Sequence, residues 1–422
     1  MKREIDPLEI SSPKKFKPDQ FPELILPNAI WIEILHCLKT IDVFGSFALV
    51  CKHFHNLTLD SKTVKILSLN RIKTRKKYLK VLNVLNRSKN LYEFKIENSS
   101  LFYDKLIVYA LKSNPKLKSL KILSQNHNQK NSTLSEEVIQ AIGEDLEHLE
   151  LVGIDHPNDE LMKKISILEN LKSLKMDIPN LGMKNLIDIG INCSKLEKVH
   201  FNWIKLETSY NLENPELNVH TNDIIDAYGK FFYERKATLK TIFMGRIDGS
   251  RILKNLVLCE NLKELRFDNA GCVNNFGLNI ISELSSLKSL LLPLCAYATN
   301  INSLFKGSNL TNLTYIYITE NNYLAEEFLI NIAENENSKL TKIFIHGCSN
   351  LKVQESTLRS LAANVQSGAK RVLGLEWKNI CKFPDSRLLE INNDMNIKIR
   401  VGNSWISMIN IMNSMDNSFF RR

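Results

Sequence analysis

The sequence predicts an α/β protein in which a small helical module precedes a curved solenoid of parallel strands backed by helices. A leucine pattern returns about every 26 residues from residue 64 onward. Stretches with helical spacing separate its copies, and residues 21–60 show helical spacing without the repeat. With 44% hydrophobic and 24% charged residues over 422 positions, the chain is expected to fold around a sizeable core.

The N-terminal residues 1–20 are polar and basic, and we expect a disordered tail there. MKREIDPLEISS contains no apolar run of signal-peptide length, so we expect neither secretion nor a membrane span. The eight cysteines are widely separated and form no Cys-x-x-Cys pair, which favours a reducing compartment. The basic clusters KR at 2–3 and KKFK at 14–17 have the spacing of a bipartite nuclear import signal. These features place the protein in the cytoplasm, the nucleus or both.

Residues 21–62 form the predicted helical module. Pro27 suits a first helical turn, and Ile30, Ile34 and Leu38 follow at helical spacing. A second helix is expected to begin near Asp42, and a third includes Val50 and Phe54, which gives a core small enough to need support from a neighbour.

This module resembles the F-box, a motif that docks on the Skp-type adaptor of cullin-RING ubiquitin ligases. The Leu-Pro pair, the Ile-Leu-x-x-Leu run and the Leu-Val-Cys-Lys-x-aromatic signature are all present, whereas Ala29 stands where an acidic residue is common. The resemblance implies an adaptor-binding role for Leu26, Pro27, Ile30, Ile34, Leu35, Leu38, Val50, Cys51 and Phe54.

CKHFH, residues 51–55, invites a metal or catalytic interpretation. On a helix Cys51 and His55 would share a face, whereas His53 would point about 200° away from both. Two ligands do not make a zinc site. We therefore expect no metal, no cofactor and no catalytic residue in this protein, and we interpret the stretch as part of a docking surface.

The repeat has the form Leu-x-x-Leu-x-Leu, with other apolar residues at some positions. We interpret each copy as a strand whose leucines enter a core shared with neighbouring copies, so the solenoid is expected over residues 63–402. Eleven copies begin at residues 64, 91, 117, 146, 171, 196, 239, 262, 287, 313 and 340. Two weaker copies lie at 371–377 and 396–401.

The repeats resemble the leucine-rich repeat family, specifically its cysteine-containing type. That resemblance implies a structural role for Cys295, Asn321 and Cys348, eight positions after the first leucine, where a side chain can satisfy backbone groups at the turn. The same type favours a cysteine three positions before that leucine, where Cys193 and Cys259 stand.

One step between repeats is 43 residues long because of an insertion at 207–220. A helix is expected after it, capped by Thr221 or Asn222, with Ile224, Ile225, Tyr228 and Phe232 on one face. The insertion is either an expanded loop or a projection that serves binding.

The residue between the last two leucines of each copy should face the inner surface of the solenoid. Along the chain this column is charged first and then apolar and aromatic. We expect exposed apolar groups there to bind a protein substrate. The predicted substrate-binding residues are Phe243, Arg266, Leu291, Tyr315, Tyr317, Phe344 and His346. Alternatively, the C-terminal tail 403–422 folds back and covers them.

The net charge of +10 is modest for a chain of 422 residues. The densest basic cluster in the sequence is RIKTRKK, residues 71–77. This cluster is either a solvated turn or a site for an acidic segment. Few aromatic residues are interleaved with it, which argues against nucleic acid.

Taken together, the resemblances imply a non-catalytic substrate-recognition subunit of an SCF-type (Skp-cullin-F-box) ubiquitin ligase. The module would bind the adaptor and the inner face would hold a substrate. The alternative is a scaffold or structural protein that uses the F-box without delivering substrates. The substrate and any need for its phosphorylation stay open.

Overall fold

The computed structural model describes most of the repeat region and none of residues 1–64. The described residues are 65–70, 82, 85, 90–97, 103–123, 135–153, 159–177, 183–202, 215–246, 250–271, 273–307, 309–335, 338–363, 371–376 and 397–402. The predicted F-box residues, the basic cluster at 71–77 and the tails at 1–20 and 403–422 therefore lie outside them.

The described strands form one parallel sheet in which each strand pairs with the next one along the chain. Every predicted strand is present, including the two from the weaker repeats, and each begins close to the second position after the first leucine. The strands are β1 Ile66–Asn70, β2 Glu93–Glu97, β3 Ser119–Leu123, β4 His148–Val152, β5 Ser173–Asp177, β6 Lys198–Asn202, β7 Thr241–Arg246, β8 Glu264–Asn269, β9 Ser289–Leu292, β10 Tyr315–Thr319, β11 Lys342–His346, β12 Arg371–Glu376 and β13 Ile397–Gly402.

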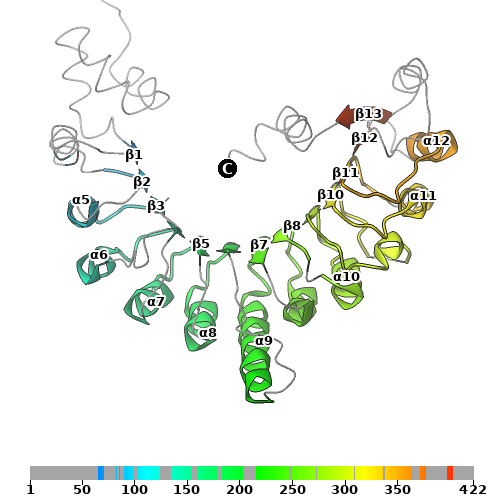
Figure 1. The fold of residues 1–422 in the computed structure, drawn as a ribbon. Helices are drawn as coiled ribbons and strands as arrows, with labels where there is room; N and C mark the ends of the chain where they lie inside the picture. Colours follow the sequence, from blue (N-terminus) through cyan, green and yellow to red (C-terminus); the bar gives the residue numbers. More distant parts are fainter. Residues whose placement is uncertain are drawn as a thin grey trace, which may run out of the picture.

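Helices lie on the outer side of the arc and the strands line its inner side (Figure 1). This confirms the predicted solenoid. The described helices are α5 Tyr103–Ser113, α6 Glu136–Ala141, α7 Asp159–Ser166, α8 Met183–Asn192, α9 Pro215–Arg235, η3 Ser250–Leu258, α10 Asn275–Ser282, η4 Ile301–Ser303, α11 Glu326–Glu334 and α12 Glu355–Ala363. None of the helices within these residues is long and apolar enough to cross a membrane.

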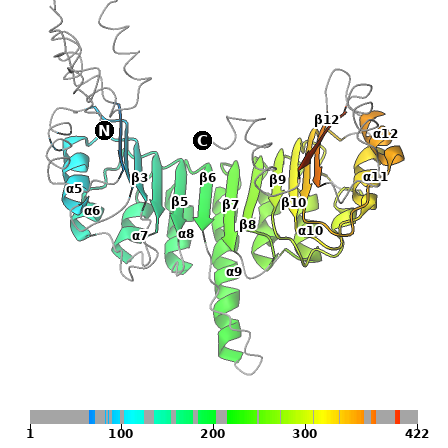
Figure 2. The ribbon, with the colours of Figure 1, turned by 45° about the horizontal axis from the view of Figure 1, so that its top comes forward.

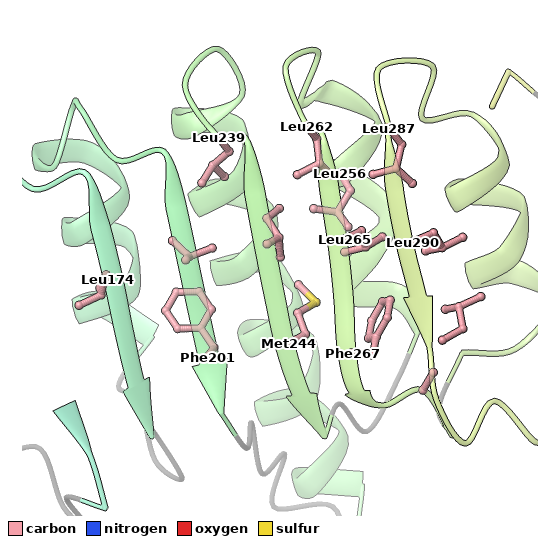
Figure 3. Packing of buried hydrophobic residues seen from close by; sticks show 14 of the residues in the cluster. Leu174, Phe201, Leu239, Met244, Leu256, Leu262, Leu265, Phe267, Leu287 and Leu290 are labelled. Atoms are coloured by element: carbon pink, nitrogen blue, oxygen red, sulfur yellow. The ribbon is translucent and has the colours of Figure 1, made fainter. Parts of the chain in front are cut away.

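The leucine positions of the repeat fill the layer between the sheet and the helices. Leu262, Leu265 and Phe267 of one repeat are buried beside Leu287 and Leu290 of the next (Figure 3). Truncating one such leucine to alanine costs about 2–5 kcal/mol, because the removed atoms leave a cavity. Since each repeat contributes one strand to this layer, neighbouring repeats stabilise one another.

Helix α9 corrects the expectation for the insertion. It begins at Pro215, so Thr221 and Asn222 lie inside the helix and neither caps it. Proline is well suited to a first helical turn because its nitrogen has no hydrogen to leave unbonded. The N-terminal part of α9 extends beyond the edge of the sheet (Figure 2).

The C-terminal half of α9 packs as predicted and contributes more than expected. Tyr228 and Phe232 are buried and Ile225 is partly buried against the core. Phe231 is also fully buried, with its ring 5.7 Å from that of Phe201 on β6. The sequence analysis predicted a single buried face of this helix and did not include Phe231. The buried side of α9 is therefore wider than predicted, because Phe231 is buried next to Phe232.

The five cysteine and asparagine positions have the structural role that the repeat type implies. Cys193, Cys259, Cys295, Cys348 and Asn321 are all buried. Each cysteine Sγ lies within hydrogen-bonding reach of a backbone carbonyl oxygen, at 3.4–3.8 Å. Burial raises the pKa of Cys193, Cys259 and Cys295 to about 12, so these thiols stay protonated at neutral pH.

Asn321 connects two neighbouring repeats at the turn after β10. Its Nδ2 donates to the carbonyl oxygens of Cys295, at 2.6 Å, and Ala298, at 3.1 Å. Its Oδ1 accepts from the backbone amides of Tyr323 and Leu324, each at 2.8 Å. One buried side chain thus satisfies four backbone groups that the turn removes from the regular sheet pattern.

The residue just before this turn position has a positive φ in four repeats. Gly153 and Gly347 have φ values of 74° and 67°, and Leu294 and Glu320 have values of 57° and 53°. Glycine reaches this region without steric cost, whereas other residues pay for it. Leu294 and Glu320 therefore hold a turn that glycine would form with less strain.

Candidate binding surface on the inner face of the solenoid

The predicted inner column exists as one continuous ladder of paired residues. Strand register aligns each member with the next, so the column runs across the whole sheet. From β1 to β13 it consists of Ser68, Lys95, Lys121, Glu150, Lys175, His200, Phe243, Arg266, Leu291, Tyr317, Phe344, Gly374 and Arg400. The alternation of side chains along each strand therefore placed the predicted members, from Lys95 to Phe344, correctly, and the register adds Ser68, Gly374 and Arg400.

The charged half of the column, from β2 to β5, is internally compensated. Lys121 Nζ lies 2.9 Å from a carboxylate oxygen of Glu93, and Lys175 Nζ lies 2.7 Å from one of Glu150. Lys95 pairs with Glu97 at 2.6 Å. These lysines each have a carboxylate partner on the same face, so this half does not present an excess of positive charge to a phosphorylated segment.

The middle of the column joins the charged half to the apolar half. The rings of His200 and Phe243 are in contact, with their centroids 3.7 Å apart and their planes tilted by 58°. Arg266 Nη2 lies 3.2 Å from a carboxylate oxygen of Glu264. Phe243 and Arg266 are both half-buried, so each keeps part of its side chain open to solvent.

An aromatic cluster, made of Tyr315, Tyr317 and Phe344, occupies the inner face of β10 and β11. It is separate from the main core and packs against the partly buried Leu291 and Val372 of β9 and β12. The rings of Tyr315 and Phe344 lie 5.7 Å apart. Burial, and then the neighbouring Tyr315 and Glu320, raise the pKa of Tyr317, which keeps its hydroxyl neutral.

The structure brings the predicted substrate-binding residues together but changes their exposure. Tyr315, Tyr317 and Phe344 are only 8%, 4% and 1% exposed, whereas an exposed patch was expected. The other four, Phe243, Arg266, Leu291 and His346, are half-buried. Their role in binding stays a prediction, and Tyr315, Tyr317 and Phe344 expose little surface to a partner.

Val372 is a member of this surface that the sequence analysis missed. It pairs with Lys342 of β11, which in turn pairs with Tyr315, so it lies one row from the central column. The signal was present in the weak repeat RVLGLEW, whose second residue occupies the same strand position as Tyr315. This repeat matches the leucine pattern only weakly, so the predicted inner column did not include it.

Metal chemistry finds no support in the part of the chain that the structure describes. Within those residues no group of three or more His, Cys, Asp and Glu side chains is placed to hold an ion. The CKHFH stretch and all nine predicted adaptor-binding residues lie outside the described residues, so their roles remain predictions.

Comparison with known proteins identifies the N-terminal module. The family model of the F-box domain matches residues 24–65. The chain therefore carries an F-box domain followed by a leucine-rich-repeat-type solenoid of parallel strands. A search of the curated proteins finds no match.

Several solved structures are similar to this chain at low identity. The Rad7 and Elc1 complex of yeast matches with 14% identity and a TM-score of 0.47, covering 92% of this chain and 85% of that one. The leucine-rich repeat protein LegL7 of Legionella pneumophila matches with 13% identity and a TM-score of 0.41, covering 71% and 98%. The Toll–Spatzle complex of Drosophila matches with 12% identity and a TM-score of 0.31, covering 74% and 46%.

Proposed function

We propose that this protein is the substrate-recognition subunit of an SCF-type ubiquitin ligase in the cytoplasm, the nucleus or both. The F-box match at residues 24–65 is the observation that carries the proposal. In this assignment the module at 21–62 binds a Skp-type adaptor and, through it, a cullin. The solenoid at 63–402 holds a protein substrate, and other subunits carry out ubiquitin transfer.

The inner face supports the recognition role. It offers half-buried apolar and charged groups, Phe243, Arg266 and Leu291, on adjacent strands of a rigid sheet. Fixed spacing between such groups favours specific binding, because little side-chain freedom is lost when a partner docks. Holding a substrate close to the ubiquitin-transferring subunits raises its effective concentration there.

The adaptor-binding role predicts the effect of truncating the F-box anchors. Phe54→Ala and Leu35→Ala should each weaken binding to a purified Skp-type adaptor by about thirtyfold, since a central apolar anchor contributes about 2 kcal/mol or more. Affinity is measured by calorimetry with the full chain. Phe276→Ala is the matched control, because Phe276 is an exposed aromatic residue of the solenoid.

Adaptor binding that survives both F-box substitutions would contradict the residue assignment. A chain that binds the adaptor but whose loss stabilises no cellular protein would instead support the scaffold alternative. The two measurements separate docking from substrate delivery.

A further inference from the structure

Two tyrosine side chains are exposed at the edge of the solenoid where strands β9 and β10 end. Tyr297 is 71% exposed and Tyr323 is 50% exposed. Each tyrosine follows by five residues a member of one register pair, Leu292 of β9 and Ile318 of β10. The two tyrosines therefore occupy matching places on adjacent turns, and this edge presents two aromatic rings to solvent.

The backbone that carries both rings is held by hydrogen bonds between the two repeats. Asn321 Nδ2 donates to the carbonyl oxygen of Ala298, which directly follows Tyr297, at 3.1 Å. Asn321 Oδ1 accepts from the backbone amide of Tyr323 at 2.8 Å. Asn302 Nδ2 donates to the carbonyl oxygen of Tyr323 at 3.0 Å. A partner that docks on these rings therefore has little backbone to order, which favours binding.

Carboxylates without a cationic partner accompany the tyrosine pair. The turns and the first helical residues at 293–303 and 319–328 contain Glu320, Glu326 and Glu327 and no lysine or arginine. Glu326 is already engaged, because its Oε1 accepts two hydrogen bonds from the next repeat, each of 2.6 Å. Glu320 and Glu327 are exposed, and neither forms an ion pair with any residue that the structure describes.

This combination of groups fits a guanidinium better than an anionic or a purely apolar side chain. A guanidinium can stack on the face of a tyrosine ring and donate paired hydrogen bonds to a carboxylate. Glu320 precedes Tyr323 by three residues and Glu327 follows it by four, so both carboxylates are near this ring in the chain. The net charge of +10 for the whole chain disfavours a basic segment elsewhere, which makes the acidic edge selective.

We propose that Tyr297 and Tyr323, together with Glu320 and Glu327, bind an arginine-containing segment of a partner protein. Arginine side chains stack on the two rings and pair with the two carboxylates. The surface lies at the edge where the strands end, so it is separate from the inner face that is assigned to substrate binding. The proposal does not depend on the ligase role.

Fluorescence anisotropy with the full chain and a labelled peptide tests this surface. The probe is Gly-Ser-Arg-Gly-Ser-Arg-Gly-Ser, and its control has citrulline in place of arginine, because citrulline has nearly the same shape without the charge. Tyr297→Ala with Tyr323→Ala removes both rings, whereas Tyr297→Phe with Tyr323→Phe keeps them. Tyr233→Ala is the control variant, since Tyr233 is 52% exposed on α9. Thermal melting verifies that each variant stays folded.

The arginine peptide should bind at least about tenfold more tightly than the citrulline peptide. The double alanine variant should bind it about tenfold more weakly, whereas the double phenylalanine variant and Tyr233→Ala should stay within about twofold of the unchanged chain. Glu320→Gln with Glu327→Gln should weaken binding by about threefold or more. The same change should reduce the dependence of the affinity on salt, because the ion pairs are lost.

No binding at about 1 mM peptide, equal binding of the two peptides, or full affinity of the double alanine variant would overturn the proposal. Tighter binding of a peptide with glutamate in place of arginine would overturn it in favour of an acidic partner. A dimer of the unchanged chain that the double alanine substitution separates would overturn it in favour of a second copy of the chain. Adaptor and substrate are absent from the assay, so the outcome is independent of whether the ligase role is correct.

Discussion

At the scale of single residues, Asn321 shows how one side chain holds two repeats together. Its amide makes four hydrogen bonds to backbone groups, and the residue is fully buried. When a buried backbone group loses its hydrogen-bond partner, the free-energy cost of removing that group from water is no longer offset. The stability of the turn after β10 therefore depends on this amide.

Asn321→Ala should lower the free energy of unfolding by about 3 kcal/mol, because it leaves several buried backbone groups without a partner. Urea denaturation measures the effect. Asn279→Ala is the control, since Asn279 is an exposed residue of α10. A loss below about 1 kcal/mol would mean that water or a rearranged turn replaces the amide.

The positive-φ position before the same turn leads to an opposite prediction. Glu320→Gly should raise the free energy of unfolding by about 1 kcal/mol, because Glu320 is exposed and holds a φ of 53°. Differential scanning calorimetry measures the change. Gly347→Ala is the matched reverse, since a Cβ there would approach Glu320 Cγ to 2.9 Å at a φ of 67°. Stabilisation by the alanine would argue against strain at this position.

At the scale of elements, the sequence predicted the strands well and the helices less well. The strands follow from a leucine pattern that recurs at nearly constant spacing. Each copy of the pattern therefore supports the strand predicted from the neighbouring copy. Helix α9 begins at Pro215, six residues before the predicted cap at Thr221, because the expected insertion at 207–220 includes this proline. Proline indicates both turns and helix starts, and only the packing of the following residues distinguishes them.

Phe231 on α9 tests how strongly that helix is held. Phe231→Ala should lower the free energy of unfolding by about 4 kcal/mol, because the ring is fully buried against Phe201 and Phe232. Tyr233→Ala, on the exposed side of the same helix, should change it by less than about 1 kcal/mol. Hydrogen exchange of α8 and α9 amides reports the local effect. Equal effects of the two changes would contradict the assigned packing.

At the scale of the whole molecule, the candidate site was only partly predictable. Strand alternation was enough to name the inner column, and the register confirms each neighbouring pair. Exposure was not predictable, because the burial of Tyr317 and Phe344 depends on the tertiary packing around them, which strand alternation does not specify. The F-box anchors came from a local signature, which needs no knowledge of tertiary contacts.

The F-box match and the sheet are contiguous in the sequence, because the match ends at residue 65 and β1 begins at Ile66. If the proposed function holds, the strands β1 to β8 separate a protein bound near β9–β11 from the end of the sheet that follows the F-box. Its lysines could reach the ubiquitin donor only through its own size and orientation, or through elastic bending of the solenoid. The repeat count would thus select which lysines on a bound protein can be modified.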